Sequence, residues 1–514
     1  MILKTIFLGL EAGGKSVVIM NGDDAERLGV LSLGRVTVRF DRVVKTAIVN
    51  TSTEMISPGR IGVCKKVWRG LGLAEGSEVE VEAAAFPDSL YFIRNKLAGR
   101  KLGSDEMREI VEDTVDEKLS DVELSAFVTA LHSFGLDLDE ATYLSLAMIE
   151  TGRTMKLDGG PIVDKHSIGG VPGDKTTLLV VPIVAAAGLL IPKSSSRAIT
   201  SPAGTADRAE VLMPVTLDLD EMQEVVERTG GCIVWGGAVH LAPADDIFVR
   251  VEYPLSIDPL LLPSIMSKKR AVGADLLVVD IPTGRGAKMK TIGEADLLAK
   301  DFMEIGSRLG IRVRCAVTYG EEPIGSAIGP SLEAREALEA LMNRGTAPDL
   351  VDKATAIAGI ILEMAGRSDG KSLAEEILSS GRAEEKMRKI IAAQGGDPNI
   401  APEDIAVGEE RLTVKSERSG TVLWINNSSV AEVAKAAGCP KDAGAGILLH
   451  KKIGDVVGEG EPLFTIVAER GSNLRRAQER LEKARVLAVG DRMEMLIHEV
   501  KERPVVKRSF TLDR

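Results

Sequence analysis

The stretch Val163–Asp207 constrains the fold more than any other part of the chain, because two polar loops flank a long apolar segment in it. The first loop, 163–177 (VDKHSIGGVPGDKTT), predicts a strand end, a glycine turn and a helix that starts at Thr176. The second loop, 193–207 (KSSSRAITSPAGTAD), is dense in hydroxyl groups. Loops that follow neighbouring strands of a parallel sheet lie at one edge of that sheet, so we expect these two loops to meet.

Both loops carry groups that bind anions. Gly169, Gly170 and Gly173 allow tight turns, and Lys165 adds a positive charge beside the free N–H groups of the helix start. The second loop has one cation, Arg197, among five hydroxyl side chains: Ser195, Ser196, Thr200, Ser201 and Thr205. We therefore expect the loops to hold one phosphate group between them. The glycine spacing matches neither the P-loop nor the dinucleotide pattern, so an ordinary strand-to-helix turn stays the alternative.

The most hydrophobic run, TTLLVVPIVAAAGLLIP (176–192), lies between the two loops. Its ~15 apolar residues are interrupted by proline and glycine and fall short of the ~20 that span a membrane. A buried helix behind the first loop is predicted instead. The N-terminus lacks a signal-peptide pattern, and four scattered cysteines lack metal-ligand spacing, so we expect a cytoplasmic protein with reduced thiols.

Hydrophobic periodicity divides the rest of the chain. Apolar strands alternate with helices over 161–240 and 272–400, which predicts an α/β core, a parallel or mixed sheet flanked by helices. Residues 86–160 predict an all-α domain of four amphipathic helices, with Ser104 and Ser120 as N-caps. The segment from about 241 to 271 is expected to return to this helical domain. A cleft between the two domains follows from this arrangement.

The two ends of the chain are rich in predicted strands. In residues 1–85, Leu28-Gly29 and Leu71-Gly72 are each followed by a glycine and a strand, which predicts a pseudo-symmetric N-terminal β-barrel-like domain for assembly. A break at 394–398 precedes a C-terminal α+β domain, 402–514. Part of it, GAGILLHKKIGDVVGEGEPLFTIV, resembles the barrel-sandwich hybrids of biotinyl and lipoyl carriers.

Charge and composition restrict the partners. The chain has 64 basic and 76 acidic residues, a net charge of −12, which argues against a nucleic-acid partner. Only 3% of the residues are aromatic, so a base-stacking platform for single strands is not expected. An anionic substrate must therefore be held by local positive groups against the overall field of the protein.

Three motifs, DKHSIGG, the following GD-x-TT, and SSR-x6-GT-x-D, resemble those of thymidine and pyrimidine-nucleoside phosphorylases, in particular the archaeal AMP phosphorylase branch. The resemblance covers about 86–500. It implies that inorganic phosphate, as co-substrate and with no other cofactor, attacks the anomeric carbon of a ribosyl group and displaces the base. By motif position it assigns the phosphate to Lys165, Ser167, Thr177, Ser195 and Thr205. It also places Gly170, Ser196, Arg197, Ala198, Ile199, Thr200 and Ser201 in the substrate site.

A purine base leaves more easily when it is protonated, which requires a carboxylic acid kept neutral by burial or by a neighbouring anion. The resemblance places this proton donor at Asp258, with Asp207 as the second candidate. Asp258-Pro259 equally fits an ordinary N-cap with proline at the first helical position, and this alternative stays open.

Further residues are expected to contact the base. Ser264 and Lys268 lie four apart, hence on one helix face, and match base-contacting positions of the pyrimidine enzymes. A solvated serine-lysine pair is the alternative. Arg250 is expected beside them, and His166 is expected to line the base pocket.

Two departures from the pyrimidine-nucleoside pattern bear on the substrate. Ser201–Thr205 replaces a histidine-threonine-glycine-glycine-threonine loop, and Lys288 replaces the phenylalanine of a Gly-Ala-Phe-Met motif. A lysine in the cleft suits a 5′-phosphate, whereas a neutral nucleoside does not need it. The alternative is that Lys288 points into solvent.

The expected function is therefore phosphorolysis of nucleoside 5′-monophosphates in nucleotide salvage, in which AMP and phosphate give adenine and ribose 1,5-bisphosphate. The resemblance suggests CMP and UMP as further substrates and a homodimer that assembles into a larger homo-oligomer, with no metal and no membrane partner. One alternative is a thymidine or pyrimidine-nucleoside phosphorylase. Another is a non-catalytic carrier or scaffold built on the terminal β domains. The family is also related in fold to anthranilate phosphoribosyltransferase, which uses an acidic metal site.

Overall fold

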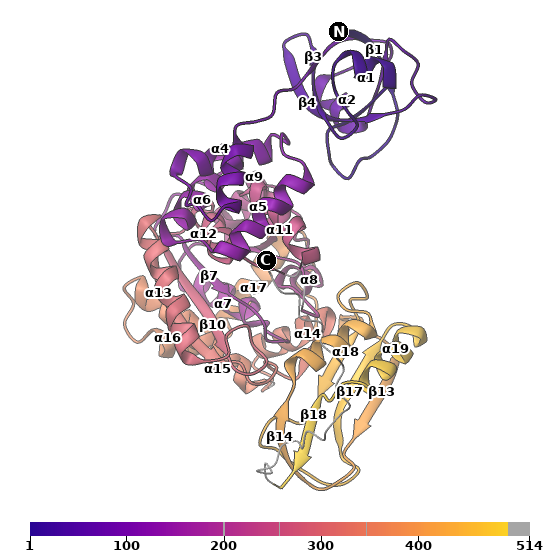
Figure 1. Ribbon diagram of the computed structural model, residues 1–514. Helices are drawn as coiled ribbons and strands as arrows, with labels where there is room; N and C mark the ends of the chain where they lie inside the picture. Colours follow the sequence, from indigo (N-terminus) through magenta and orange to yellow (C-terminus); the bar gives the residue numbers. More distant parts are fainter. Residues whose placement is uncertain (199–200, 256, 346, 492–514) are drawn as a thin grey trace.

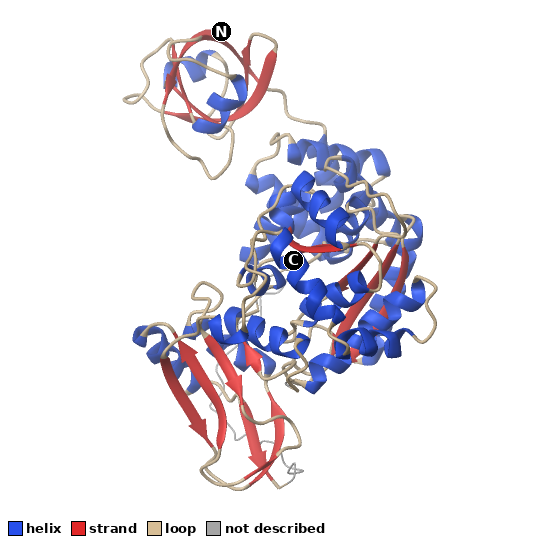
Figure 2. Ribbon diagram, turned by 180° about the vertical axis from the view of Figure 1, so that it is seen from behind, coloured by secondary structure: helices blue, strands red, loops and turns tan. Residues whose placement is uncertain are grey.

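The computed structural model describes residues 1–198, 201–255, 257–345 and 347–491. The chain begins in a β-barrel, continues through a helical bundle and an α/β part, and ends in two antiparallel sheets with two helices (Figure 1). The barrel lies at one end of the molecule and the C-terminal sheets at the other, as the view from behind also shows (Figure 2). Within the described residues, no helix is long and apolar enough to cross a membrane.

The strands of the α/β part are parallel, as predicted. One sheet has the order β11-β10-β7, and β8 pairs with β9 in a second sheet. A bridge between Ile162 and Leu190 joins the two sheets, which places β8 beside β7. The strands are β7 (Val163–Ser167), β8 (Ile191–Ser195), β9 (Gly231–Trp235), β10 (Leu276–Thr283) and β11 (Arg312–Tyr319).

Helices cover both faces of these strands. Along β10, Leu276 and Val278 belong to one apolar core, whereas Leu277 and Val279 belong to another, because alternate residues of a strand point to opposite faces. The first core is formed with α7 (Thr176–Ala186), α14 (Pro330–Leu341), α15 (Pro348–Met364), α16 (Gly370–Ser379) and α17 (Arg382–Ala393). The second core contains α12 (Leu261–Ala271) and α13 (Ile292–Arg308), and α9 (Leu219–Thr229) packs on β9.

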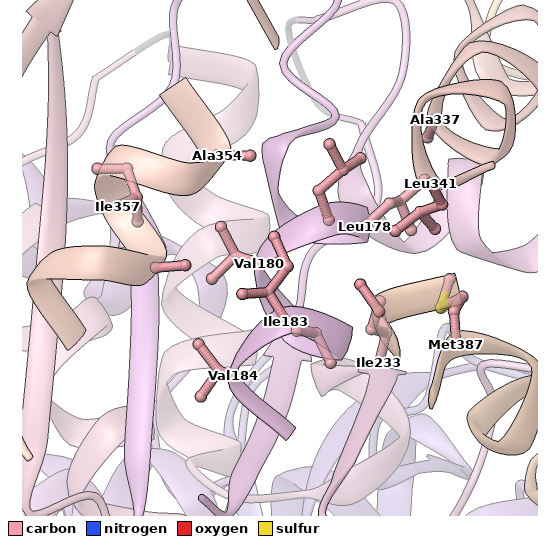
Figure 3. Packing of buried hydrophobic residues seen from close by; sticks show 14 of the residues in the cluster. Leu178, Val180, Ile183, Val184, Ile233, Ala337, Leu341, Ala354, Ile357 and Met387 are labelled. Carbon is pink, nitrogen blue, oxygen red and sulfur yellow. The ribbon is translucent and has the colours of Figure 1, made fainter. Parts of the chain in front are cut away.

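Helix α7 lies in the middle of the first core and is apolar on all sides. Figure 3 shows its side chains Leu178, Val180, Ile183 and Val184 against Ile233 of β9 and against α14, α15 and α17. Full burial of such side chains contributes ~1.5–3 kcal/mol each. The helix ends at Ala186, shorter than the predicted 176–192, because Gly188 adopts φ 87° and the chain then turns into β8.

The four helices predicted over 86–160 are α3 (Ser89–Leu97), α4 (Ser104–Val115), α5 (Asp121–Phe134) and α6 (Leu138–Glu150). Helix α11 (Pro243–Leu255) packs with them, and its Phe248 ring lies 5.8 Å from that of Phe127. Ser120 caps α5 as predicted. The prediction for Ser104 was wrong, since Gly103 occupies the cap position and donates its N–H to the Glu106 carboxylate (2.7 Å).

The N-terminal segment forms a closed barrel of order β1-β5-β2-β4-β3-β6. Its pairings are symmetric, because β1 with β5 and β2 with β4 are the two parallel pairs. The predicted repeat is confirmed at Gly29 and Gly72, which follow the two helices with φ 67° and 65°, angles that favour glycine. The elements are β1 (Ile2–Phe7), β2 (Val17–Met20), α1 (Gly22–Arg27), β3 (Arg35–Phe40), β4 (Val43–Thr51), β5 (Arg60–Val63), α2 (Lys65–Leu71) and β6 (Glu78–Ala83).

The C-terminal part has two antiparallel sheets, of order β12-β15-β17-β13 and β16-β14-β18. Strand β12 precedes α14 in the chain, so the α/β part contributes an edge strand to a C-terminal sheet. The elements are β12 (Ala327–Ile328), β13 (Glu410–Lys415), β14 (Gly420–Ile425), α18 (Asn427–Ala437), β15 (Gly446–Leu449), β16 (Val456–Val457), β17 (Pro462–Ala468), α19 (Gly471–Leu481) and β18 (Leu487–Gly490).

Candidate active site

The glycine loop (168–175) follows β7 and the hydroxyl loop (196–204) follows β8, and a single side chain joins them. Arg208, on α8 (Thr205–Glu210), donates to the main-chain carbonyl of Asp174 in the glycine loop and to that of Ala203 in the hydroxyl loop (2.7 Å). Arg208 is buried and pairs with Glu333 (3.0 Å). The two loops therefore meet as expected, through an arginine that no sequence motif indicated.

Three of the five predicted phosphate residues lie around the glycine loop. The buried Lys165 donates from Nζ to Thr177 Oγ1 (3.3 Å), and Ser167 Oγ donates to Asp174 Oδ2 (3.2 Å). Thr177 is the second residue of α7, whose N-terminal end carries the positive end of the helix dipole. Gly169 and Gly170 adopt φ 79° and 96°, which keeps the turn tight. This arrangement suits an anion at the start of α7.

A buried cluster of charged side chains, formed by Lys353, Asp280 and Asp174, supports the glycine loop. Lys353, on α15, pairs with Asp280 (2.8 Å) on β10 and with Asp174 (3.5 Å), and Thr318 donates to Asp280 (2.6 Å). Burial opposes the charge on Asp174, but Lys353 and Lys165 outweigh it and hold the pKa of that carboxyl below its usual range. Burial lowers the pKa of Lys165, and a bound phosphate anion would favour its charged form. Lys353 carries no local sequence signal.

The hydroxyl loop is ordered by Asp207, which was the second candidate for the general acid. Asp207 Oδ2 accepts the N–H groups of Ala198 (2.7 Å) and Gly204 (2.8 Å), and Oδ1 lies 3.3 Å from the Arg197 guanidinium. Both oxygens of the Asp207 carboxylate are thus already bound. Asp207 therefore holds the loop, and this position disfavours it as a proton donor.

Arg197 is the loop's predicted cation, but its charge is already neutralised. The guanidinium binds Glu210 (Nη2 to Oε1, 2.7 Å) as well as Asp207 and lies 5.0 Å from the centre of the Trp235 ring. Arg197 is thus held by two carboxylates, and its contact with the substrate stays a prediction.

The other predicted residues in the hydroxyl loop, and those that flank it, differ in their hydrogen bonds and exposure. Ser195 Oγ donates to the Val234 carbonyl (2.9 Å), and Ser201 Oγ donates to the Ala203 carbonyl (3.1 Å). Ser196 is exposed, and Thr205 is the half-buried first residue of α8. The predicted residues Ile199 and Thr200 lie outside the described residues. Two of the described hydroxyl groups, those of Ser195 and Ser201, thus bind backbone carbonyls of the protein itself.

Lys288 lies between the glycine loop and the predicted acid. Its Nζ is 3.1 Å from Asp258 Oδ2, with 40% of the lysine side chain and 50% of the aspartate side chain exposed. A Cβ atom on Gly170 would lie only 2.6 Å from the Lys288 backbone nitrogen, so the two loops are in direct contact. Lys288 therefore adjoins the glycine loop and pairs with Asp258 while it stays exposed, so its place in the substrate site remains a prediction.

Asp258 is not a helix cap. Helix α12 begins at Leu261, and Leu260 occupies the cap position, so the N-cap alternative was wrong. Asp258 is half exposed, and its carboxylate is held in an ion pair with Lys288. A role as proton donor therefore requires that this pair opens first.

Helix α12 brings Ser264 and Lys268 to one face, as the spacing predicts. Lys268 Nζ lies 2.5 Å from Asp245 of α11, which is fully buried. Burial opposes the lysine charge, but Asp245 outweighs it and raises the pKa of Lys268. Arg250 is exposed on α11. Asp245 was missed by sequence reasoning, because nothing in its local pattern distinguishes it from a surface aspartate.

His166 occupies the strand position between Lys165 and Ser167. Burial, together with the charge of Lys269, holds its pKa well below the usual value. The imidazole is therefore neutral at physiological pH, which suits contact with a base better than proton transfer. Among the described residues, no group of three or more His, Cys, Asp or Glu side chains is arranged to hold a metal ion.

Comparisons with known proteins match three parts of the chain to known families. Residues 90–152 match the helical bundle domain and 159–384 the a/b domain of a glycosyl transferase family, and 421–488 match the pyrimidine nucleoside phosphorylase C-terminal domain. The chain is 49% identical to the AMP phosphorylase of Thermofilum pendens over 100% of both chains. It is 50% identical to that of Thermococcus kodakarensis over 90% of this chain and 93% of the relative.

The chain belongs to the AMP phosphorylase family. The resemblance drawn from DKHSIGG and the neighbouring motifs is thereby confirmed. Anthranilate phosphoribosyltransferase from Thermus thermophilus is similar in structure, with a TM-score of 0.51 and 21% identity over 59% of this chain and 98% of that chain, which supports the shared fold alone. Family membership also identifies the chain as an enzyme, a pentosyltransferase.

The predicted carrier-like segment contains two lysines, Lys451 and Lys452, and both form ion pairs. Lys451 pairs with Glu461 (2.9 Å), and Lys452 pairs with Asp349 (3.1 Å) and donates to the Gly325 carbonyl (3.2 Å). A carrier presents a free lysine at an exposed hairpin tip. These contacts therefore disfavour the carrier alternative.

Proposed function

We propose that the chain cleaves AMP with inorganic phosphate, giving adenine and ribose 1,5-bisphosphate. Membership of the AMP phosphorylase family supports the reaction class and the nucleotide. The observation that carries the proposal within the site is Lys288, a cation in contact with the glycine loop and paired with the candidate acid Asp258. A neutral nucleoside offers this lysine no partner, whereas a 5′-phosphate does.

The attacking phosphate binds at the glycine loop in this proposal. Lys165, Ser167 and Thr177 supply charge and hydrogen bonds, and the start of α7 adds its dipole. Ser195 and Thr205 face it from the hydroxyl loop. Phosphate is itself a competent nucleophile once it is oriented and partly desolvated, so no activated side chain is needed.

Asp258 protonates the leaving base. When Lys288 turns to the 5′-phosphate, its ion pair with Asp258 opens and the carboxyl group becomes available to the leaving base. Ser264 and Lys268 contact the base from α12, and His166 lines its pocket. Substrate binding would thus prepare the acid for its task.

The deciding experiment compares base release from AMP, CMP, UMP and the matching nucleosides, with and without phosphate. We expect AMP to be cleaved only when phosphate is present, with CMP and UMP as slower substrates. Base release at the same rate without phosphate would identify a hydrolase. A preference for nucleosides would favour the thymidine or pyrimidine-nucleoside alternative.

Lys288→Met tests the reading of the 5′-phosphate directly. A charge-assisted contact in a partly desolvated cleft contributes ~1.5–3 kcal/mol, so kcat/KM for AMP should fall ~10- to 150-fold. Adenosine lacks the 5′-phosphate and should lose almost nothing. An equal loss for both substrates would show that Lys288 does not contact this group.

The remaining expectations stay part of the proposal. They are a cytoplasmic enzyme that needs no metal or organic cofactor, and a homodimer that assembles into a larger homo-oligomer through residues 1–85. Exposed apolar side chains on the barrel support the assembly role, among them Leu31 (83% exposed) and Leu33 (71%).

A further inference from the structure

The loop that carries Lys288, 284–289, is held by the C-terminal part of the chain. Asn427 is the first residue of α18 and is only 1% exposed. Its Nδ2 donates to the Gly320 carbonyl (2.9 Å), at the end of β11. A Cβ atom on Gly286 would lie 2.6 Å from Asn427 Cβ, so the loop backbone rests directly on this side chain.

Gly320, which accepts the hydrogen bond from Asn427, also contacts the 284–289 loop and the residue before it. Its N–H donates to the Thr283 carbonyl (2.9 Å), and a Cβ atom on Gly320 would lie 3.1 Å from Ala287 Cβ. The Ala287 N–H donates to the Gly284 carbonyl (3.1 Å), which closes the turn immediately before Lys288. The backbone at Lys288 therefore packs against Gly170 of the glycine loop, and the Gly320–Asn427 pair supports it in addition to the hydrogen bond from Lys290 Nζ to the Ala287 carbonyl (2.7 Å).

Other C-terminal residues form hydrogen bonds with the segment that follows Gly320. The Ile453 N–H donates to Glu322 (2.9 Å), and Lys452 donates to the Gly325 carbonyl (3.2 Å). Asn427 Oδ1, in contrast, has no hydrogen-bond partner among the described residues. A buried unpaired amide oxygen costs stability, so the hydrogen bond from Nδ2 to Gly320 is what favours an asparagine at this position.

We propose that Asn427 is a positioning residue for substrate selection, which holds the 284–289 loop so that Lys288 reaches the 5′-phosphate. The C-terminal domain is then part of the specificity machinery of the site. This inference rests on the proposed function, because it takes Lys288 as the group that contacts the 5′-phosphate.

Asn427→Ala tests the inference through the ratio of kcat/KM values for AMP and adenosine. Loss of a buried neutral hydrogen bond should lower kcat/KM for AMP roughly 3- to 10-fold and leave adenosine nearly unchanged. The KM for phosphate should stay within about twofold, because the glycine loop keeps its own support. In the Lys288→Met background, Asn427→Ala should change the ratio no further, since both residues then act through one contact.

Asn473→Ala is the matched control. Asn473 lies on α19 of the same domain and donates to Asp442 (2.5 Å), away from the loop. It should leave the AMP-to-adenosine ratio unchanged. Gly286→Ala, which forces a Cβ against Asn427, should reproduce the selective loss and carries the test if Asn427→Ala does not fold.

Equal losses on AMP and adenosine, or an additive effect in the Lys288→Met background, would overturn the inference. If Lys288→Met abolishes the preference for AMP while Asn427→Ala and Gly286→Ala leave it intact, only the role of Asn427 fails. If Lys288→Met itself leaves the preference intact, the proposed function of Lys288 fails, and the positioning role falls with it.

Discussion

At the residue scale, the site is built from cations that are already paired with carboxylates. Lys353 binds Asp280, Lys268 binds Asp245, and Lys288 binds Asp258. Pairing is expected of buried or partly buried charges, because an isolated charge away from water is costly. The exposed Lys288–Asp258 pair is the one that a substrate phosphate can open at least cost, so it is where recognition and catalysis can be coupled.

Asp258→Asn keeps the shape of the side chain but cannot donate a carboxyl proton. We expect turnover of AMP to fall ~10²- to 10⁴-fold. The melting temperature should change little, because Asp258 does not cap α12 and is half exposed. Steady-state kinetics and thermal unfolding check both points. Near-wild-type turnover would mean that another group protonates the base.

Glu252 should make the stability of the protein depend on pH. Burial, assisted by the charges of Asp258 and Asp245, raises its pKa from 4.5 to about 8. Between these values the folded state binds more protons than the unfolded state, so the free energy of unfolding falls as pH rises through this window. Below it both states are protonated and the effect vanishes.

Glu252→Gln removes this titration while keeping the shape of the side chain. Near pH 5 the variant and the wild type should have the same melting temperature. Near pH 9 the variant should melt at a higher temperature, because its free energy of unfolding is about 1–3 kcal/mol larger. Unfolding followed across this pH range is the measurement. A difference that does not vary with pH would contradict the raised pKa.

At the element scale, the site depends on two loops at neighbouring strand ends that must keep one geometry. The glycine loop is fixed by Asp174 and Lys353, and the hydroxyl loop by Asp207. Arg208 links one loop to the other through two backbone carbonyls. A planar guanidinium can bind two acceptors at once, whereas an ammonium group cannot reproduce this fork.

Arg208→Lys keeps the charge opposite Glu333 but removes the bridge between the loops. We expect KM for phosphate to rise about 5- to 10-fold with a smaller effect on kcat, which corresponds to ~1–1.4 kcal/mol, the size of one typical hydrogen bond. Arg335→Lys is the control, because Arg335 also binds two backbone carbonyls, those of Pro402 (2.8 Å) and Ile405 (2.9 Å), but outside the site. Equal effects of both changes on KM would refute the bridging role.

At the scale of the whole molecule, the predicted site residues all lie in the middle of the chain, and the two ends of the chain differ in whether they contact the site. The C-terminal part packs on the loop that carries Lys288. Within the described residues, the hydrogen bonds and ion pairs of the N-terminal barrel with the rest of the chain lie near the start of α5. They include Arg35 with Glu123 and Ser16 with Glu117 (2.6 Å). It contributes no predicted substrate residue.

Deletion of residues 1–85 should therefore separate assembly from catalysis. We expect light scattering to show a smaller particle, while phosphorolysis of AMP continues at a rate within about threefold of the full chain per active site. The barrel's exposed apolar side chains give the physical reason for self-association. A particle of unchanged size would refute the assembly role.

Local sequence patterns were sufficient for much of the fold. The helix start at Thr176, the alternation of strands and helices in the α/β core, and the repeat around Gly29 and Gly72 could all be predicted, because periodicity and turn chemistry act over a few residues. Short motifs were also sufficient for the family. Ser104 was misplaced by one position, since capping depends on contacts that its neighbours make equally well.

What only the tertiary structure decided is how the charges are paired and what supports each loop. Lys353, Arg208, Asp245 and Asn427 are ordinary residues within their own segments, and no local pattern marks them. Each gains its role from a partner distant in the sequence: Asp174 for Lys353 and for Arg208, Lys268 for Asp245, and Gly320 for Asn427. Such pairs form only when packing brings distant elements within hydrogen-bond distance, so the sequence determined the chemistry that is available and the fold determined where it acts.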